Sequence, residues 1–213
     1  MAELIAIDDQ PISATFFGEG KFLTEFITPG NLEVQELHKD IINGIDKLDD
    51  RLVALRDWVA SNVRYTKFVR GKMWVDGKSS TQNDLWTQPS ITSRILVGNC
   101  ATKSFLLASL VRNELPENSA YCVLGNLYNG KPGGHAWVLV KLNGQEYIME
   151  STRADTPPLV LAGPATDRYE AVHLFNDKVT YAIEGRTVLE PFTACFSTWL
   201  KDYLDFAYIE GRK

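Results

Sequence analysis

The chain has 213 residues, of which 45% are hydrophobic and 23% are charged, and its formal net charge is −5. This mildly acidic, ordinary globular composition lacks the basic surface of a nucleic-acid-binding protein, and no apolar run reaches the roughly 18 residues that a membrane span requires. We therefore expect a single globular domain, 1–213, with no nucleic-acid or membrane partner.

The three cysteines, Cys100, Cys122 and Cys195, predict neither a disulfide framework nor a zinc motif, because their number is odd and no pair is closely spaced. Residues 1–12 are acidic and lack a basic segment before an apolar one, so they do not resemble a secretory signal. We expect a cytoplasmic protein with reduced thiols, and a single disulfide is the alternative. No cofactor and no metal ion is expected.

The first half of the chain is predicted to be mainly helical after an extended lead-in over residues 1–30. Asn31 is a candidate helix cap. From 33 to 62 the apolar residues recur at helical spacing, and Gly44 is a candidate break between two helices. Residues 73–83 are polar and contain glycine, which predicts a loop.

Two more helical segments are expected before the strands begin. Residues 91–96 form a short one, closed by Gly98. Residues 100–112 are apolar nearly all round the helix, which is typical of a helix buried on every side rather than an amphipathic one.

The second half is predicted to form strands. Residues 120–127 read as one strand, and 135–142 and 145–152 as two more, joined by Asn143-Gly144, the dipeptide preferred in tight hairpin turns. Weaker patterns predict strands at 169–175 and 179–183 and a terminal helix at 192–209. Helices first and strands later predict an α+β architecture.

Cys100 is the first candidate for chemistry. It follows Gly98-Asn99 at the start of the buried helix, where unpaired N–H groups and the helix dipole favour negative charge. A thiol there ionises more easily, and the thiolate is the nucleophile. We expect Gly98 to let the chain turn sharply and expose the sulfur. Position alone does not separate this interpretation from a small core residue, since cysteines are often buried.

The hairpin brings a histidine and a carboxylate together. A two-residue turn at 143–144 sets a register in which Trp137 faces Glu150 and His135 faces Thr152, so these four side chains share one face of the sheet. Glu150 is then the diagonal neighbour of His135, about 7–8 Å away between backbones and within reach for a long side chain. A carboxylate there can orient the imidazole and stabilise its protonated form. A β-bulge would break this inference.

Taken singly, His135 is best explained as a satisfied strand histidine and Glu150 as a strand-end charge that reaches solvent. Together with Cys100 at a helix start, they form the nucleophile, base and orienting carboxylate that thiol catalysis needs.

Three motifs in this order resemble the transglutaminase-like superfamily, whose papain-related core packs a Cys-bearing helix against an antiparallel sheet that carries His and an acid. The motifs are Gly98-Asn99-Cys100, Gly134-His135-Ala136-Trp137 and Glu150-Ser151-Thr152. The approach to them also resembles the family, through Asp57-Trp58-Val59 to Tyr65 and through Asp84-Leu85-Trp86 before Pro89. The resemblance covers 52–156 and implies a catalytic triad of Cys100, His135 and Glu150.

Two residues depart from the family pattern. The third triad member is usually Asp, and Glu150 is one methylene longer. Many bacterial relatives have acidic residues beside the Cys, whereas this chain has Asn99, Ala101 and Thr102. We therefore expect no calcium site beside the nucleophile.

The remaining candidates have supporting roles. The Cys100 backbone N–H is the natural first oxyanion donor, and the Trp86 indole N–H or Gln88 is a candidate for the second; plain core packing is an equal alternative for Trp86. We expect Trp137 to pack beside His135 and shield it from water. His38 lies in a polar stretch of the first helix, so we expect it to face solvent.

The leading hypothesis is a cysteine peptidase or amidase that acts on a protein or peptide. Cys100 attacks an amide or ester carbonyl, His135 protonates the leaving amine, and water resolves the thioester. If an amine resolves it instead, the protein is a protein-glutamine transglutaminase. A second hypothesis is an inactive binding module on the same fold. A third is a zinc site formed by Cys100, His135 and Glu150.

Overall fold

The computed structural model describes residues 4–6, 22–66, 71–75, 78–82, 86–128, 132–165 and 167–188. Its helices are η1 (Leu23–Phe26), α1 (Leu32–Ile42), α2 (Leu48–Asn62), α3 (Pro89–Ile95), α4 (Cys100–Val111) and α5 (Ala162–Ala165). Its strands are β1 (Leu4–Ala6), β2 (Arg64–Tyr65), β3 (Gly71–Val75), β4 (Lys78–Gln82), β5 (Val97–Gly98), β6 (Ala120–Leu127), β7 (Gly133–Leu142), β8 (Gln145–Met149), β9 (Val160–Leu161), β10 (Tyr169–Phe175) and β11 (Thr180–Ile183). In the described part of the chain, no helix is long and apolar enough to cross a membrane.

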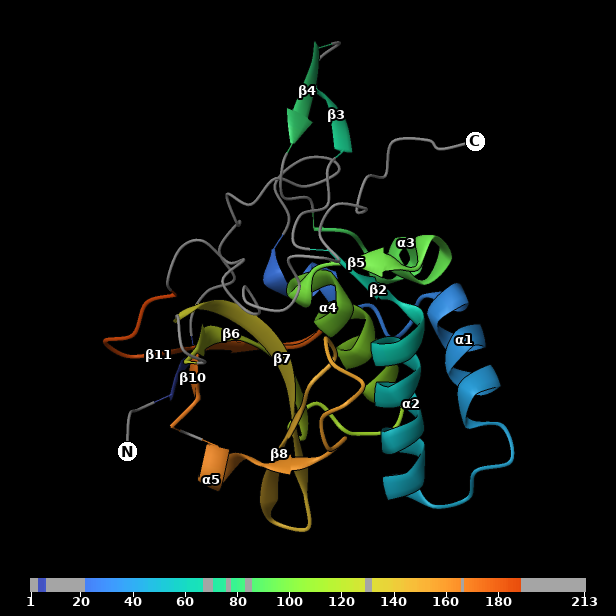
Figure 1. Ribbon diagram of the computed structural model, residues 1–213, viewed down its shortest axis with the longest axis vertical. Helices are drawn as coiled ribbons and strands as arrows, with labels where there is room; N and C mark the ends of the chain where they lie inside the picture. The colour runs from blue at the N-terminus through green and yellow to red at the C-terminus, as the bar shows by residue number, and fades with distance from the viewer. Residues whose placement is uncertain are drawn as a thin grey trace.

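A seven-stranded sheet forms one side of the fold. Its strand order is β1-β11-β10-β6-β7-β8-β9, and every neighbouring pair is antiparallel. Helix α4 lies between this sheet and the helices α1 and α2 (Figure 1). Apart from β1 and α5, the helices precede the strands of this sheet along the chain, so the α+β architecture that the sequence predicts is confirmed.

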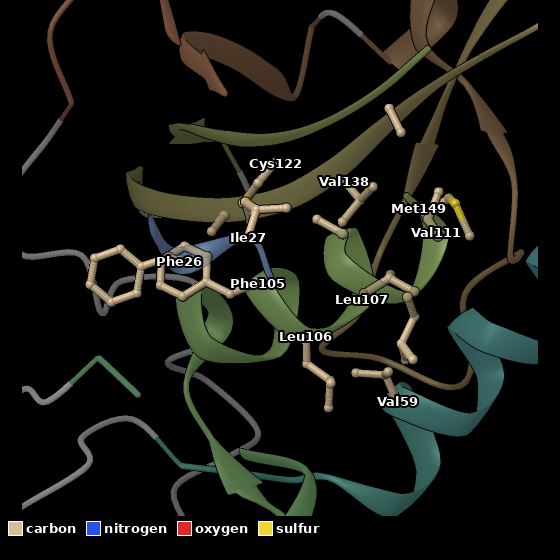
Figure 2. Packing of buried hydrophobic residues seen from close by; sticks show 14 of the residues in the cluster. Phe26, Ile27, Val59, Phe105, Leu106, Leu107, Val111, Cys122, Val138 and Met149 are labelled. Carbon is tan, nitrogen blue, oxygen red and sulfur yellow. The ribbon is translucent and has the colours of Figure 1, made fainter. Parts of the chain in front are cut away.

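Helix α4 is the centre of the core. All twelve of its residues are buried, as its apolar sequence predicts. In Figure 2, Phe105 packs against Phe26, and Leu106 points toward Val59 of α2. Val138 of β7 lies on the side of the sheet. Because packing surrounds α4, its first residue is held at a defined place.

The predicted break in the first helical region is confirmed. Helix α1 ends at Ile42 and α2 begins at Leu48, with Gly44 between them at a φ of +75°. The predicted cap is also present, because the Asn31 side chain accepts hydrogen bonds from the backbone N–H groups of Glu33 and Val34.

The hairpin β7–β8 has the predicted turn and register. Asn143 and Gly144 both have positive φ, at 51° and 77°, which is the geometry of the two-residue turn that this dipeptide favours. Leu142 pairs with Gln145, and the ladder continues in step to Val138 and Met149. The ladder ends there, so the strand predicted at 145–152 is shorter than expected, and Glu150 is the first residue beyond β8.

The predictions for residues 73–83 and for His38 are wrong. Residues 73–83 are not a plain loop, because β3 pairs with β4 and Val75 is opposite Lys78; the intervening Asp76-Gly77 is a hairpin signal that the polar composition obscured. His38 does not face solvent. It is 8% exposed, and its Nε2 lies 2.7 Å from Glu114 Oε1, while Arg51 contacts the other oxygen of Glu114, Oε2, at 3.2 Å. The predicted helix at 192–209 and Cys195 lie outside the described residues.

Candidate active site

Cys100 is the first residue of α4. The Asn99 side chain caps the helix by accepting the backbone N–H of Thr102 at 3.0 Å. This cap leaves the sulfur at the positive end of the helix dipole, where a thiolate is favoured. The position of Cys100 predicted from the sequence is therefore confirmed.

Gly98 has a different role from the expected one, and the predicted exposure of the sulfur is wrong, because Cys100 is buried. Its φ is not positive, and the left-handed turn before Cys100 is made by Leu96, with a φ of 52°. A Cβ on Gly98 would meet Thr102 Oγ1 at 2.4 Å. Glycine is therefore needed because strand β5 passes against the first turn of α4. The parallel pairing of β5 with β2 holds this approach in place.

His135 and Glu150 meet as the hairpin register predicts. Nε2 of His135 lies 2.8 Å from Oε2 of Glu150, and the two side chains are 0% and 2% exposed. The extra methylene of Glu150 does not prevent the contact. The diagonal geometry expected for the hairpin thus places the carboxylate against the imidazole, with no solvent between them.

Four donors surround the Glu150 carboxylate. Oε1 accepts the backbone N–H of Thr152 at 2.9 Å and its hydroxyl at 2.6 Å. Oε2 lies 2.8 Å from His135 Nε2 and accepts the Tyr169 hydroxyl at 3.1 Å. A carboxylate has about four acceptor sites, so each is used. Burial alone would raise the pKa of Glu150, but the charge of His135 and these hydrogen bonds lower it to about 2.

The same contacts keep His135 protonated. Burial lowers the pKa of this imidazole, but the negative charge of Glu150 and hydrogen bonds to Cys100 and Glu150 together raise it to about 10. Cys100 therefore lies within hydrogen-bonding range of the ring. Because Glu150 engages Nε2, the nitrogen that remains for Cys100 is Nδ1. The structure thus brings together the three residues that the sequence predicted as a triad.

Aromatic rings cover the imidazole. The ring of Trp137 stacks on His135 with centroids 6.0 Å apart and planes 29° apart, as expected for its shielding role. Tyr169 lies 6.2 Å from His135 and 5.1 Å from Trp137, edge to face with the indole. The resulting low-polarity surroundings strengthen the charge interaction between His135 and Glu150.

Sequence reasoning missed the residues that support the Glu150 segment from the helices. Arg56 of α2 is 1% exposed; its Nε donates to Glu150 O at 2.9 Å, and Nη2 donates to Arg153 O at 2.8 Å. Ser104 of α4 hydrogen bonds Ser151 at 3.0 Å. A charged residue within an otherwise apolar helical stripe was the available signal for Arg56. Its hydrogen-bond partners lie about a hundred positions away along the chain, so no local sequence pattern predicts them.

Lys103 is a second buried cation that the sequence did not single out. It donates from Nζ to the carbonyls of Ala60 and Val63 at the end of α2. Burial lowers its pKa to about 7. These hydrogen bonds satisfy carbonyl groups that a helix end otherwise leaves unpaired, so Lys103 joins α4 to α2.

The two candidates for a second oxyanion donor make structural contacts. The Trp86 ring packs edge-on against Phe26 and Phe105, with centroids 5.7 Å and 5.3 Å apart. The Gln88 side-chain amide donates to Glu25 O at 3.0 Å. Their oxyanion role stays a prediction.

Cys122 is a buried core residue, and no disulfide joins it to Cys100. Burial raises the pKa of the Cys122 thiol well above its ordinary value, which marks it as inert. Within the described ranges, no group of three or more His, Cys, Asp or Glu side chains has the arrangement of a metal site.

The sequence matches no protein-family model and no curated protein. The structure is similar to that of LapG from Legionella pneumophila, with a TM-score of 0.50 and 12% identity over 75% of this chain and 84% of that chain. EGTA-treated LapG gives a TM-score of 0.50 and 11% identity over 78% and 86%. A candidate cysteine protease from Cytophaga hutchinsonii gives 0.45 and 19% over 76% of this chain and 54% of that one. The chain therefore has an α+β fold of the transglutaminase-like, papain-related kind.

Proposed function

We propose that this protein is a cysteine-nucleophile acyl-transfer enzyme that hydrolyses an amide or peptide bond through a thioester. The observation that carries the proposal is the arrangement around His135, which Glu150 holds on one side and Cys100 contacts on the other. A buried imidazolium beside a thiol at a helix N-terminus favours the thiolate.

In the first step, the Cys100 sulfur attacks the carbonyl carbon of the substrate and a carbon–sulfur bond forms. Negative charge develops on the carbonyl oxygen at the N-terminal end of α4, where the helix dipole stabilises it. His135 then gives its Nδ1 proton to the leaving nitrogen as the carbon–nitrogen bond breaks. The products are a free amine and a thioester on Cys100.

In the second step, neutral His135 takes a proton from water, and the resulting hydroxide attacks the thioester. The carbon–sulfur bond breaks, the acid leaves, and the thiolate–imidazolium pair returns. Glu150 keeps its charge throughout and holds the ring by Nε2, which is the role of the carboxylate in a triad. The proposed substrate is a protein or peptide, and we favour water over an amine acceptor by resemblance to small bacterial members of the superfamily.

The test is a product analysis with a mixture of denatured proteins and peptides, in ¹⁸O-labelled water, with and without a primary amine. We expect new carboxyl termini that carry ¹⁸O with the native protein and none with Cys100→Ala; Cys122→Ala is the matched control and should keep activity. Products that carry the amine in preference to ¹⁸O would replace hydrolysis by transamidation.

One observation favours the binding-module alternative. Cys100 is 1% exposed and His135 is 0% exposed, so a substrate reaches the sulfur only after neighbouring chain moves aside. A protein that binds a peptide equally well as Cys100→Ala, and that turns over no peptide in the assay above, would establish this alternative in place of the enzyme.

A further inference from the structure

Tyr169 donates to Glu150 from outside both the proposed triad and the segment that carries Glu150. It begins β10, which pairs with β6, and β6 in turn pairs with the strand that carries His135. Its hydroxyl donates to Glu150 Oε2 at 3.1 Å, the same oxygen that lies 2.8 Å from His135 Nε2. Two donors, one from β7 and one from β10 on the other side of β6, therefore share a single carboxylate oxygen.

The pKa of the Tyr169 hydroxyl is raised, so the hydroxyl stays a donor at pH values where an ordinary tyrosine begins to ionise. Burial is the largest cause that raises the pKa of Tyr169, and the charge and hydrogen bond of Glu150 add to it. The charged groups that face Tyr169 are Glu150, His135, Arg153 and Arg168, and the two arginines oppose the rise only in part. Tyr169 therefore does not take up or lose the proton that moves in the reaction.

We propose that Tyr169 is a positioning residue for the His135–Glu150 pair, whose hydroxyl makes Glu150 a weaker base and so keeps the shared proton on His135. This inference rests on the proposed thiol chemistry. A hydrogen bond to a carboxylate stabilises its ionised form. With four donors, Glu150 holds imidazolium without taking its proton.

Removing the hydroxyl changes this balance in a defined direction. Glu150 becomes more basic and competes for the Nε2 proton. Whenever the proton moves to the carboxylate, the imidazole is neutral and the Cys100 thiolate loses its cation. The thiolate then forms only at higher pH, so the acid limb of its reactivity moves upward.

The test compares the pH dependence of Cys100 alkylation by iodoacetamide in the native protein, Tyr169→Phe and Tyr181→Phe. Tyr181 lies on β11 in the same sheet and its ring contacts Tyr121, so it is a matched loss of a hydroxyl. We expect the acid limb of Tyr169→Phe to move up by about one pH unit, the size that the loss of one hydrogen bond to a charged group gives. Tyr181→Phe should superimpose on the native profile.

A second variant covers the case in which Tyr169→Phe does not fold. Incorporation of 3-fluorotyrosine at position 169 keeps the shape and makes the hydroxyl a stronger donor, so the acid limb should move to lower pH. Superimposed profiles for the native protein and the folded variants would overturn the role of Tyr169. A native Cys100 that alkylates like an ordinary thiol would instead overturn the proposed function, so the two failures are distinguishable.

Discussion

At the scale of single residues, Glu150 departs from the superfamily that the sequence resembles, yet it is well supported by contacts. Glu150 stands where Asp is usual, and its longer side chain reaches Thr152 with one oxygen and His135 with the other. The side chain of Asp is one methylene shorter, so it would lose the contact either with Thr152 or with His135. The replacement is therefore part of a consistent local geometry.

Glu150→Gln tests the charge of this residue. The amide keeps the size but removes the anion, so the raised pKa of His135 should fall and the Cys100 thiolate should form only at higher pH. We expect Cys100 alkylation at pH 6 to slow by at least about tenfold, which corresponds to one pKa unit. Glu146→Gln, an exposed change on β8, is the control. An unchanged rate for Glu150→Gln would show that the carboxylate does not act on the thiol.

The same pair predicts how stability depends on pH. The pKa of Glu150 is lowered from 4.5 to about 2, so its contribution is complete above pH 4.5 and is lost as pH falls toward 2. The pKa of His135 is raised from 6.5 to about 10, so its contribution is complete below pH 6.5 and is lost as pH rises toward 10.

Melting temperatures from circular dichroism, measured against pH, check this. The difference between the native protein and Glu150→Gln should be largest between pH 4.5 and 6.5 and should shrink on both sides. A difference that stays constant with pH would contradict the ionised pair.

At the scale of elements, the site depends on how helices hold a segment that follows a strand. The segment after β8 has no regular structure up to β9. Arg56 from α2 and Ser104 from α4 bind it, so the acid is fixed relative to the helix that carries Cys100. Burial of an unpaired charge is costly, and here Asp57 and backbone carbonyls provide the compensating contacts of the Arg56 guanidinium.

Arg56→Met should therefore destabilise the fold. It leaves the carbonyls of Glu150, Arg153 and Thr156 without their donor, and we expect a loss of about 3–5 kcal/mol in the free energy of unfolding. Chemical denaturation measures this. Arg94→Met, which removes an exposed pair with Glu33, is the matched control and should leave stability unchanged. Equal effects of the two changes would mean that Arg56 does not anchor the segment.

Gly125→Ala tests the packing of the sheet beneath the site. Gly125 is opposite His135 in β6, and a Cβ there would meet Glu170 O at 2.2 Å and Trp137 Cη2 at 2.6 Å. We expect a destabilisation of about 1–3 kcal/mol from overpacking and altered near-ultraviolet circular dichroism from the displaced indole. Gly30→Ala, where a Cβ meets nothing within 4 Å, should change neither. A well-tolerated Gly125→Ala with an unchanged spectrum would contradict this account.

At the scale of the whole molecule, the sequence predicts what depends on neighbours along the chain. The cap at Asn31, the break at Gly44 and the hairpin turn at 143–144 are local features, and each is confirmed. The hairpin then extends the prediction to a longer range, because its register brings Glu150, the first residue beyond β8, close to His135.

Long-range contacts were not predictable in the same way. Tyr169 follows Glu150 by 19 positions and reaches it only because β10 pairs with β6. Arg56 and His38 looked like ordinary helix residues, since their partners are far away in the sequence. Residues that support a site from distant elements leave no periodic signal, whereas the residues that carry out the proposed chemistry stand at recognisable turns and helix starts.

The most direct test of the central claim is the rate of Cys100 alkylation by iodoacetamide from pH 4 to pH 9, with the label located by peptide mass, in the native protein and in His135→Ala. An ordinary thiol titrates near ~8.5, and a thiol paired with histidine titrates several units lower. We expect fast labelling of Cys100 at acid pH in the native protein, and we expect His135→Ala to abolish this fast labelling. An ordinary profile in both proteins would contradict the thiolate–imidazolium pair.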